Sequence, residues 1–145
     1  QPKLVSQVAS TFGNQCIVAG IDYKTGSNGI KVWIRSGTEK TNLDPLEHAL
    51  FLEESGAGEI LLNSIDRDGT MKGYDLEMAD RISAALHIPV IIAGGAGNFL
   101  HLSELLGQTA ASAAACASLF HFGDNNPIRA RSFLKNQNIP SRVLK

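Results

Sequence analysis

The sequence predicts an α/β fold in which a parallel four-stranded sheet is flanked by helices. Short apolar segments alternate with amphipathic ones along the 145 residues, a pattern typical of strand–helix–strand crossovers. Several apolar segments are nearly continuous runs of Val, Ile, Leu and Ala, as expected for strands buried on both faces of a parallel sheet. The length is that of one domain, so residues 1–145 are expected to form a single unit.

The N-terminal part begins with a helix. Over residues 2–12, apolar side chains recur at helical spacing, and Gly13 is the expected stop; these side chains are Leu4, Val5, Val8 and Phe12. Residues 16–21 then predict a buried strand that ends at Asp22. Residues 30–34 predict a short extra strand with a turn-rich loop on either side.

The next helix has well-marked N-terminal signals. Asp44 is placed to cap it, Pro45 suits its first turn, and Glu47 completes a capping box. Gly56 is the expected end, and the stripe expected to face the core consists of Leu46, Ala49 and Leu50.

The remaining chain repeats the strand–helix pattern. The expected order is a strand at 59–65, a helix at 74–86, a strand at 89–93, a helix from Asn98 to Leu106, a strand of small residues at 111–117, a turn at 118–122, a helix from Asn126 to about Gln137 and a short extended tail at 138–145.

Composition and spacing exclude several functional classes. A net charge of −1 lacks the basic excess of nucleic-acid or membrane-surface proteins, and no apolar run reaches the roughly 18 residues of a membrane span. Cys16 and Cys116 fit buried free thiols of a reducing compartment, and with no signal-peptide pattern a cytoplasmic location is expected. No cofactor or metal is expected, because a G-x-G-x-x-G motif is missing and the four histidines lack ligand spacing.

Polar or glycine-rich residues follow each of the four expected parallel strands. They are Asp22 after the first, Asp66, Asp68 and Gly69 after the second, Gly94 to Gly97 after the third and Ser118 after the fourth. The carboxyl ends of parallel strands meet at one edge of a sheet, where such folds place their chemistry. We therefore expect a catalytic edge with carboxylates beside backbone N–H groups.

Two kinds of chemistry are predicted at this edge. The glycine run lets backbone approach a ligand, and a helix opens directly after it, as in phosphate sites; the alternative is a strand-to-helix turn without a ligand. Asp68 is a candidate general acid or base, with Asp22 as a neighbouring carboxylate. The alternative for the Asp66–Gly69 loop is an Asp-Gly turn whose side chains cap their own backbone.

Four stretches resemble the C-terminal half of the cyclase-subunit family of imidazole glycerol phosphate synthase. They are GAGEILLNSIDRDGT, KGYDLEM, PVIIAGGAG and AACASLFHF, and the resemblance runs from about residue 2 to residue 145. That family is a (β/α)₈ TIM barrel of two similar halves, which implies a (β/α)₄ half-barrel here. It also implies ammonia-dependent ring closure of a phosphorylated ribulose aminoimidazole-carboxamide nucleotide in histidine biosynthesis, with ammonia supplied by a glutaminase subunit.

The resemblance assigns roles to individual residues. Asp68 resembles the catalytic aspartate of the C-terminal half, and Asp22 resembles a second acidic position in the site. Glu59, at the opposite end of its strand, resembles one member of the charged ring through which ammonia enters. The phosphate-site lining is expected from Gly69, Gly94, Gly95, Ala117 and Ser118.

Departures from the family leave three functions open. The other catalytic aspartate and the second phosphate site belong to an N-terminal half that this sequence lacks, and Asn63, Ala93 and the KTGSNG loop differ from the usual pattern. The chain is therefore a cyclase, a phosphate-binding half-barrel that homo-oligomerises without turnover, or a cyclase-like subunit that delivers ammonia for surface-polysaccharide synthesis.

Four βα units are too few to close a barrel, which usually takes about 250 residues. An open sheet leaves strand edges and an apolar face uncovered, and both features favour association with another chain. The sequence therefore predicts a homodimer whose two copies close an eight-stranded barrel.

Overall fold

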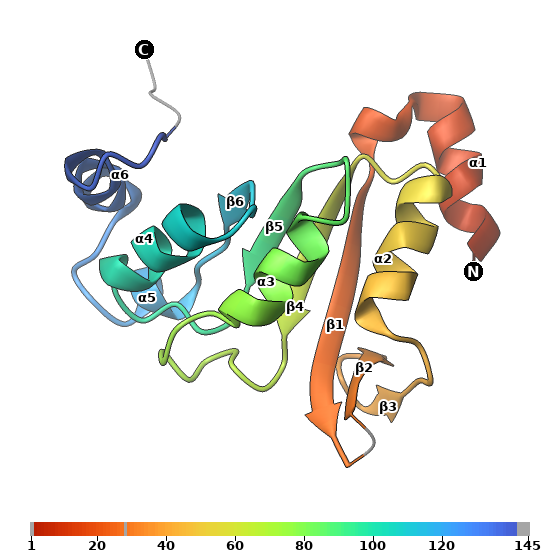
Figure 1. The fold of residues 1–145 in the computed structure, drawn as a ribbon, viewed down its shortest axis with the longest axis horizontal. Helices are drawn as coiled ribbons and strands as arrows, with labels where there is room; N and C mark the ends of the chain where they lie inside the picture. The colour runs from red at the N-terminus through yellow and green to blue at the C-terminus, as the bar shows by residue number, and fades with distance from the viewer. Residues whose placement is uncertain (1, 28, 142–145) are drawn as a thin grey trace.

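The computed structural model describes residues 2–27 and 29–141, so residues 142–145 of the expected tail lie outside it. Along the chain (Figure 1) the elements are α1 (Pro2–Phe12), the 3₁₀ turn η1 (Asn14–Cys16), β1 (Val18–Gly26), β2 (Gly29–Ile34), β3 (Glu39–Lys40), α2 (Pro45–Glu54), β4 (Glu59–Ser64), α3 (Leu76–Ser83), β5 (Val90–Ala93), α4 (Phe99–Gln108), β6 (Ala113–Ala114), α5 (Ser118–His121) and α6 (Pro127–Asn136). Across the described ranges, no helix is both long and apolar enough to cross a membrane.

The strands form one six-stranded mixed sheet in the order β3-β2-β1-β4-β5-β6. Neighbours among β1, β4, β5 and β6 are parallel, whereas β2 pairs antiparallel with β1, and β3 antiparallel with β2. The predicted parallel four-stranded sheet is therefore wrong, although α/β is right. β1 continues to Gly26 and folds back through Gly29, because antiparallel strands need only a tight turn between them.

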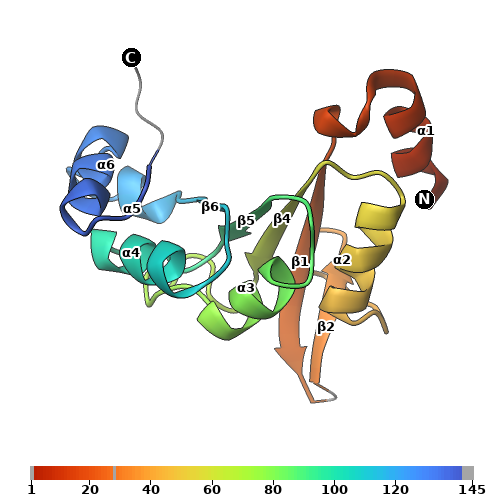
Figure 2. The same ribbon diagram turned by 45° about the horizontal axis from the view of Figure 1, so that its top comes forward.

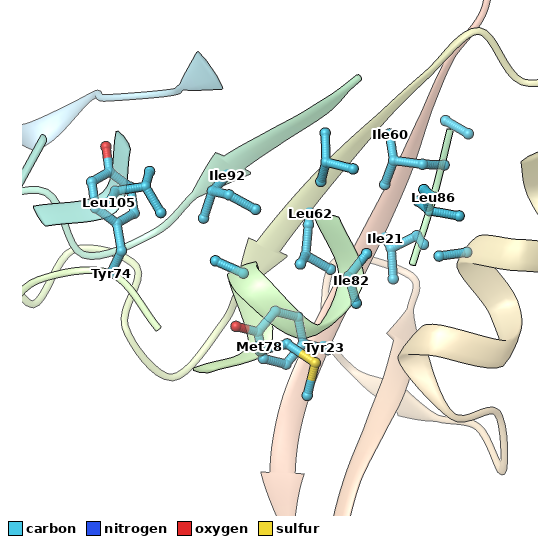
Figure 3. Packing of buried hydrophobic residues seen from close by; sticks show 14 of the residues in the cluster. Ile21, Tyr23, Ile60, Leu62, Tyr74, Met78, Ile82, Leu86, Ile92 and Leu105 are labelled. Atoms are coloured by element: carbon cyan, nitrogen blue, oxygen red, sulfur yellow. The ribbon is translucent and has the colours of Figure 1, made fainter. Parts of the chain in front are cut away.

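The two faces of the parallel strands differ in cover. Side chains alternate along a strand, so every second residue shares a face. One face packs under α2, α3 and α4 (Figure 2). Its buried side chains are Ala19, Ile21, Tyr23, Ile60, Leu62, Val90 and Ile92. Figure 3 shows part of this core. On the other face Val18 is 54% exposed, and Leu61 and Ile91 are only half-buried. We call this second face the bare face.

Several element boundaries differ from expectation for local reasons. α3 begins at Leu76 and not at residue 74, because the Asp75 Oδ1 caps it by accepting from Met78 N (3.2 Å). Cys16 is exposed because it lies in η1, outside the sheet, so its predicted burial is wrong. In α2 the expected Ala49 is buried, but Leu52 is buried in place of Leu50, which is 36% exposed.

The Asp44 cap of α2 is as predicted and is testable by substitution, whereas among the described residues the Glu47 carboxylate accepts no hydrogen bond from Asp44 N, so the expected capping box is not completed. Asp44 Oδ1 accepts from the N–H groups of Leu46 (2.8 Å) and Glu47 (3.3 Å). Asp44→Ala is expected to lower the free energy of unfolding by about 1 kcal/mol, because these helix N–H groups lose their acceptor. Urea unfolding measures the change. Asp44→Asn, which keeps an acceptor, should cost less than half as much; an equal loss would instead assign the effect to the charge pair with Arg81 at 3.6 Å.

Candidate functional site

Loops that follow β4, β5 and β6 meet in a small polar pocket. Its lining is Asp68, Gly69, Gly94, Gly95, Ala96, Ala115, Cys116, Ala117 and Ser118. The structure thus brings together all five residues predicted to contact phosphate, with Asp68 beside them. The free volume is about 10 Å³, which is space for about one water-sized group, so a larger ligand would place one oxygen inside and the rest at the mouth.

Backbone donors are available at this pocket. Within residues 29–141, the N–H groups of Gly95, Ala117 and Ser118 donate to no protein acceptor. Ser118 is the first residue of the short helix α5, whose first N–H groups have no partner within the helix. Unpaired N–H groups that line a polar pocket suit an anionic oxygen, because each supplies a hydrogen bond and a partial positive charge.

Glycines make the close meeting of these loops possible. Gly73 N donates to the Gly95 carbonyl at 2.7 Å, and a Cβ on Gly95 would overlap the Gly73 carbonyl oxygen. Gly95 also has φ +107°, a conformation that strains any residue with a side chain. The glycine run is therefore needed for loop contact as well as for an open ligand surface.

A second, larger pocket of about 400 Å³ adjoins the first. It is lined by Asp22, Ser36, Gly37, Asn63, Ile65 and Asp68. The two strands carrying Asp22 and Asn63 pair in register, and Asn63 Nδ2 donates to Asp22 Oδ1 at 2.9 Å. Asp68 lines both pockets, so the two predicted carboxylates share the larger hollow and one of them also lines the polar pocket.

The structure also adds and removes candidate residues. Asn63 was visible as a polar residue within an apolar strand, whereas Ser36 and Gly37 reach the hollow only because the β2–β3 hairpin folds over it. Asp66 takes a structural role, since its Oδ2 accepts from Thr25 N at 2.7 Å.

Cys116 is unsuited to be a nucleophile, although it lines the polar pocket. Burial raises the pKa of its thiol above the usual range, which keeps it protonated near neutral pH. Among the described residues, no group of three or more His, Cys, Asp or Glu is placed to hold a metal ion.

Glu59 lies at the other end of the sheet. It pairs in register with Val18 and shares the bare face with Leu61 and Asn63. Asn63 is four positions further along β4, or about 13 Å away along the strand. This position agrees with the expected separation between Glu59 and the carboxylates.

Fold and site together define an α/β protein with a mixed sheet that is consistent with part of a (β/α) barrel and has polar groups at the carboxyl ends of its parallel strands. Barrel enzymes handle their substrates at this edge.

Comparisons with known proteins place the chain more narrowly. It belongs to the histidine biosynthesis protein family, whose sequence pattern matches residues 1–126. It is 42% identical to imidazole glycerol phosphate synthase subunit HisF of Lactococcus lactis subsp. cremoris (strain SK11) over 99% of this chain. HisF subunits of Clostridium botulinum (strain Okra / Type B1) and Chlorobium limicola (strain DSM 245 / NBRC 103803 / 6330) are 43% and 42% identical over 98% and 99% of this chain. The resemblance seen in the sequence is therefore confirmed.

The chain is shorter than these relatives. It spans 56% of the L. lactis protein and 57% of each of the other two.

The glycine contact predicts an unequal effect of two identical substitutions. Gly95→Ala is expected to lower the melting temperature by several degrees, since the new Cβ overlaps the Gly73 carbonyl oxygen at a backbone φ that disfavours side chains. Gly20→Ala is the matched control, because a Cβ there meets nothing within 4 Å. Calorimetry measures both; equal melting temperatures for the two variants would contradict the close approach of the loops.

Proposed function

We propose that the chain supplies the C-terminal half of an imidazole glycerol phosphate synthase cyclase site. The reaction is ammonia-dependent ring closure of a phosphorylated ribulose aminoimidazole-carboxamide nucleotide. The observation that carries this proposal is the position of Asp68, which lines both the anion-suited pocket and the larger hollow. A phosphate held in the first pocket would direct the rest of the substrate toward the second.

The residues at the edge take separate roles. Gly69, Gly94, Gly95, Ala117 and Ser118 bind one phosphate of the substrate, mainly through backbone N–H groups. Asp68 transfers a proton during ring closure, and Asp22, oriented by Asn63, is the second carboxylate. A carboxylate held by an amide in a defined rotamer is well placed to act on a bound substrate.

Ammonia would arrive from the opposite end of the bare face. Glu59 marks that end and would contribute to a charged entrance facing a glutaminase subunit. The family and the relatives favour histidine biosynthesis over the surface-polysaccharide pathway.

A substitution at Asp68 tests the proton-transfer role. Asp68→Asn keeps the size of the side chain and removes its ability to exchange a proton, so cyclisation is expected to fall by about 100-fold or more. The assay measures imidazole glycerol phosphate formed from the nucleotide substrate and an ammonium salt.

Asp66→Asn is the control, because it lies in the same loop and keeps an acceptor for Thr25 N. Turnover by Asp68→Asn equal to wild type would refute the role of Asp68. If the wild-type chain binds phosphate without any turnover, the phosphate-binding half-barrel becomes the better description.

The bare face gives the second part of the proposal: two copies of the chain pair to close a barrel. Val18 is 54% exposed at one end of this face, and Leu61 and Ile91 lie half-buried beside it. One edge of the sheet is β6, which has only two residues. Near the other edge, β2 pairs only with residues 22–26 of β1, so residues 18–21 of β1 have no strand partner on that side within the described sheet. Unpaired strand edges and apolar faces favour a partner of the same kind.

Mass measurement tests this dimer. Light scattering at micromolar concentration should give twice the 15.5 kDa of one chain. Val18→Lys is expected to give a monomer, because it places a charge on the bare face that the two copies would bury. Folding of one copy should be little affected, since the side chain of Val18 is already exposed there. Ile128→Lys is the control, since Ile128 is 67% exposed on α6, and it should leave the dimer intact. A monomeric wild type would contradict the pairing.

A further inference from the structure

Tyr74 makes a long-range hydrogen bond to the loop that lines the polar pocket. Its side chain is 3% exposed, and its hydroxyl donates to the Ala115 carbonyl at 3.0 Å. The same oxygen lies 3.2 Å from Cys116 Sγ. Tyr74 itself precedes α3 and does not line the polar pocket, so any effect on a ligand must pass through the backbone of residues 115–118.

The segment that carries Tyr74 also holds the neighbouring loop. Gly73 N donates to the Gly95 carbonyl (2.7 Å), and Arg67 Nη1 donates to the Gly73 carbonyl (3.2 Å). Asp68 and Gly69 lie between these contacts in the sequence. One segment, residues 67–74, therefore contributes to the pocket and connects the two other loops that form it.

Apart from the turn of α5, where the Ala117 carbonyl accepts from the N–H groups of Phe120 and His121, the Ala115–Ser118 loop has few other restraints. Its preceding strand β6 contains only two residues, and the ladder ends where Ala115 N donates to Ile92 O at 2.8 Å. The alanines at 113, 114, 115 and 117 supply little side-chain packing. The hydroxyl of Tyr74 accordingly takes the place of a ladder partner for the Ala115 carbonyl, which would otherwise lose a hydrogen bond in a partly buried position.

We infer that Tyr74 is a positioning residue: its hydroxyl holds the Ala115–Ser118 loop so that the N–H groups of Ala117 and Ser118 face an anion. The inference rests on the proposed function, because it assumes that this pocket binds the substrate phosphate. It adds a residue that lies outside the pocket and on which the affinity of the pocket for phosphate depends. Preorganised donors bind more tightly, since no loop ordering accompanies binding.

Tyr23 offers a matched control within the same core. It is 2% exposed, and its hydroxyl donates to Asp75 Oδ2 at 3.0 Å. Burial raises the pKa of both tyrosines, so both hydroxyls stay protonated and act as donors at neutral pH. Figure 3 shows the two side chains well apart, and the Tyr23 hydroxyl bonds Asp75 rather than the Ala115–Ser118 loop.

The experiment compares Tyr74→Phe, Tyr23→Phe and wild type, each of which differs by a single hydroxyl. The probe is inorganic phosphate, titrated by NMR, with hydrogen exchange of the Ala115 amide measured in parallel. Tyr74→Phe should weaken phosphate binding by about tenfold and speed Ala115 exchange, because the loop loses its partner. Tyr23→Phe should match wild type in both measurements.

Each other outcome counts against the inference in a recognisable way. If wild type binds phosphate and Tyr74→Phe binds it equally well, the positioning role is overturned and the proposed function stands. Equal weakening in both variants, or a Tyr74→Phe chain that fails to fold while Tyr23→Phe folds, assigns the hydroxyl to general stability and overturns the role too. Wild type without phosphate binding overturns the inference together with the phosphate site of the proposed function.

Discussion

The hydrogen bond between the Gly73 N–H and the Gly95 carbonyl brings the loops after β4 and β5 to within 2.7 Å of each other. Such proximity leaves no room for a side chain at Gly95. Because the loops meet there, Asp68 and Gly69 from one loop and Gly94 and Gly95 from the other line a common pocket. The chemistry of the site therefore depends on backbone packing more than on any single charged group.

A second constraint is the alternation of side chains along the parallel strands. Burying Ile60 and Leu62 under the helices forces Glu59, Leu61 and Asn63 onto the opposite face. The same alternation puts Asp22 beside Asn63, because the strands β1 and β4 pair in register. One pattern thus produces both the hydrophobic core and the face that carries Asp22 and Glu59.

Much of the site was predictable because it follows from strand ends. The glycine run comes directly after β5 and Asp68 lies in the loop after β4, and parallel strands place such residues at one edge; Asp22, expected just after its strand, lies within the longer β1. The β2–β3 hairpin was not predictable in this way: a short strand at residues 30–34 was expected, but its pairing with β1 depends on contacts outside the segment. Tyr74 was expected inside a helix, but the Asp75 cap starts α3 after it, and its hydrogen bond to the distant Ala115 carbonyl has no local signal in the sequence.

The sequence alone determined the α/β class, the order of the longer helices and of the parallel strands, the family and the residues at the carboxyl edge, because these depend on local periodicity, capping and motif. Tertiary structure decided the mixed six-stranded sheet, the hollow under Ser36 and Gly37, and the contacts of Asn63 and Tyr74. These features join residues that are far apart in the chain, so no local pattern encodes them and only the packing of the folded chain brings them together.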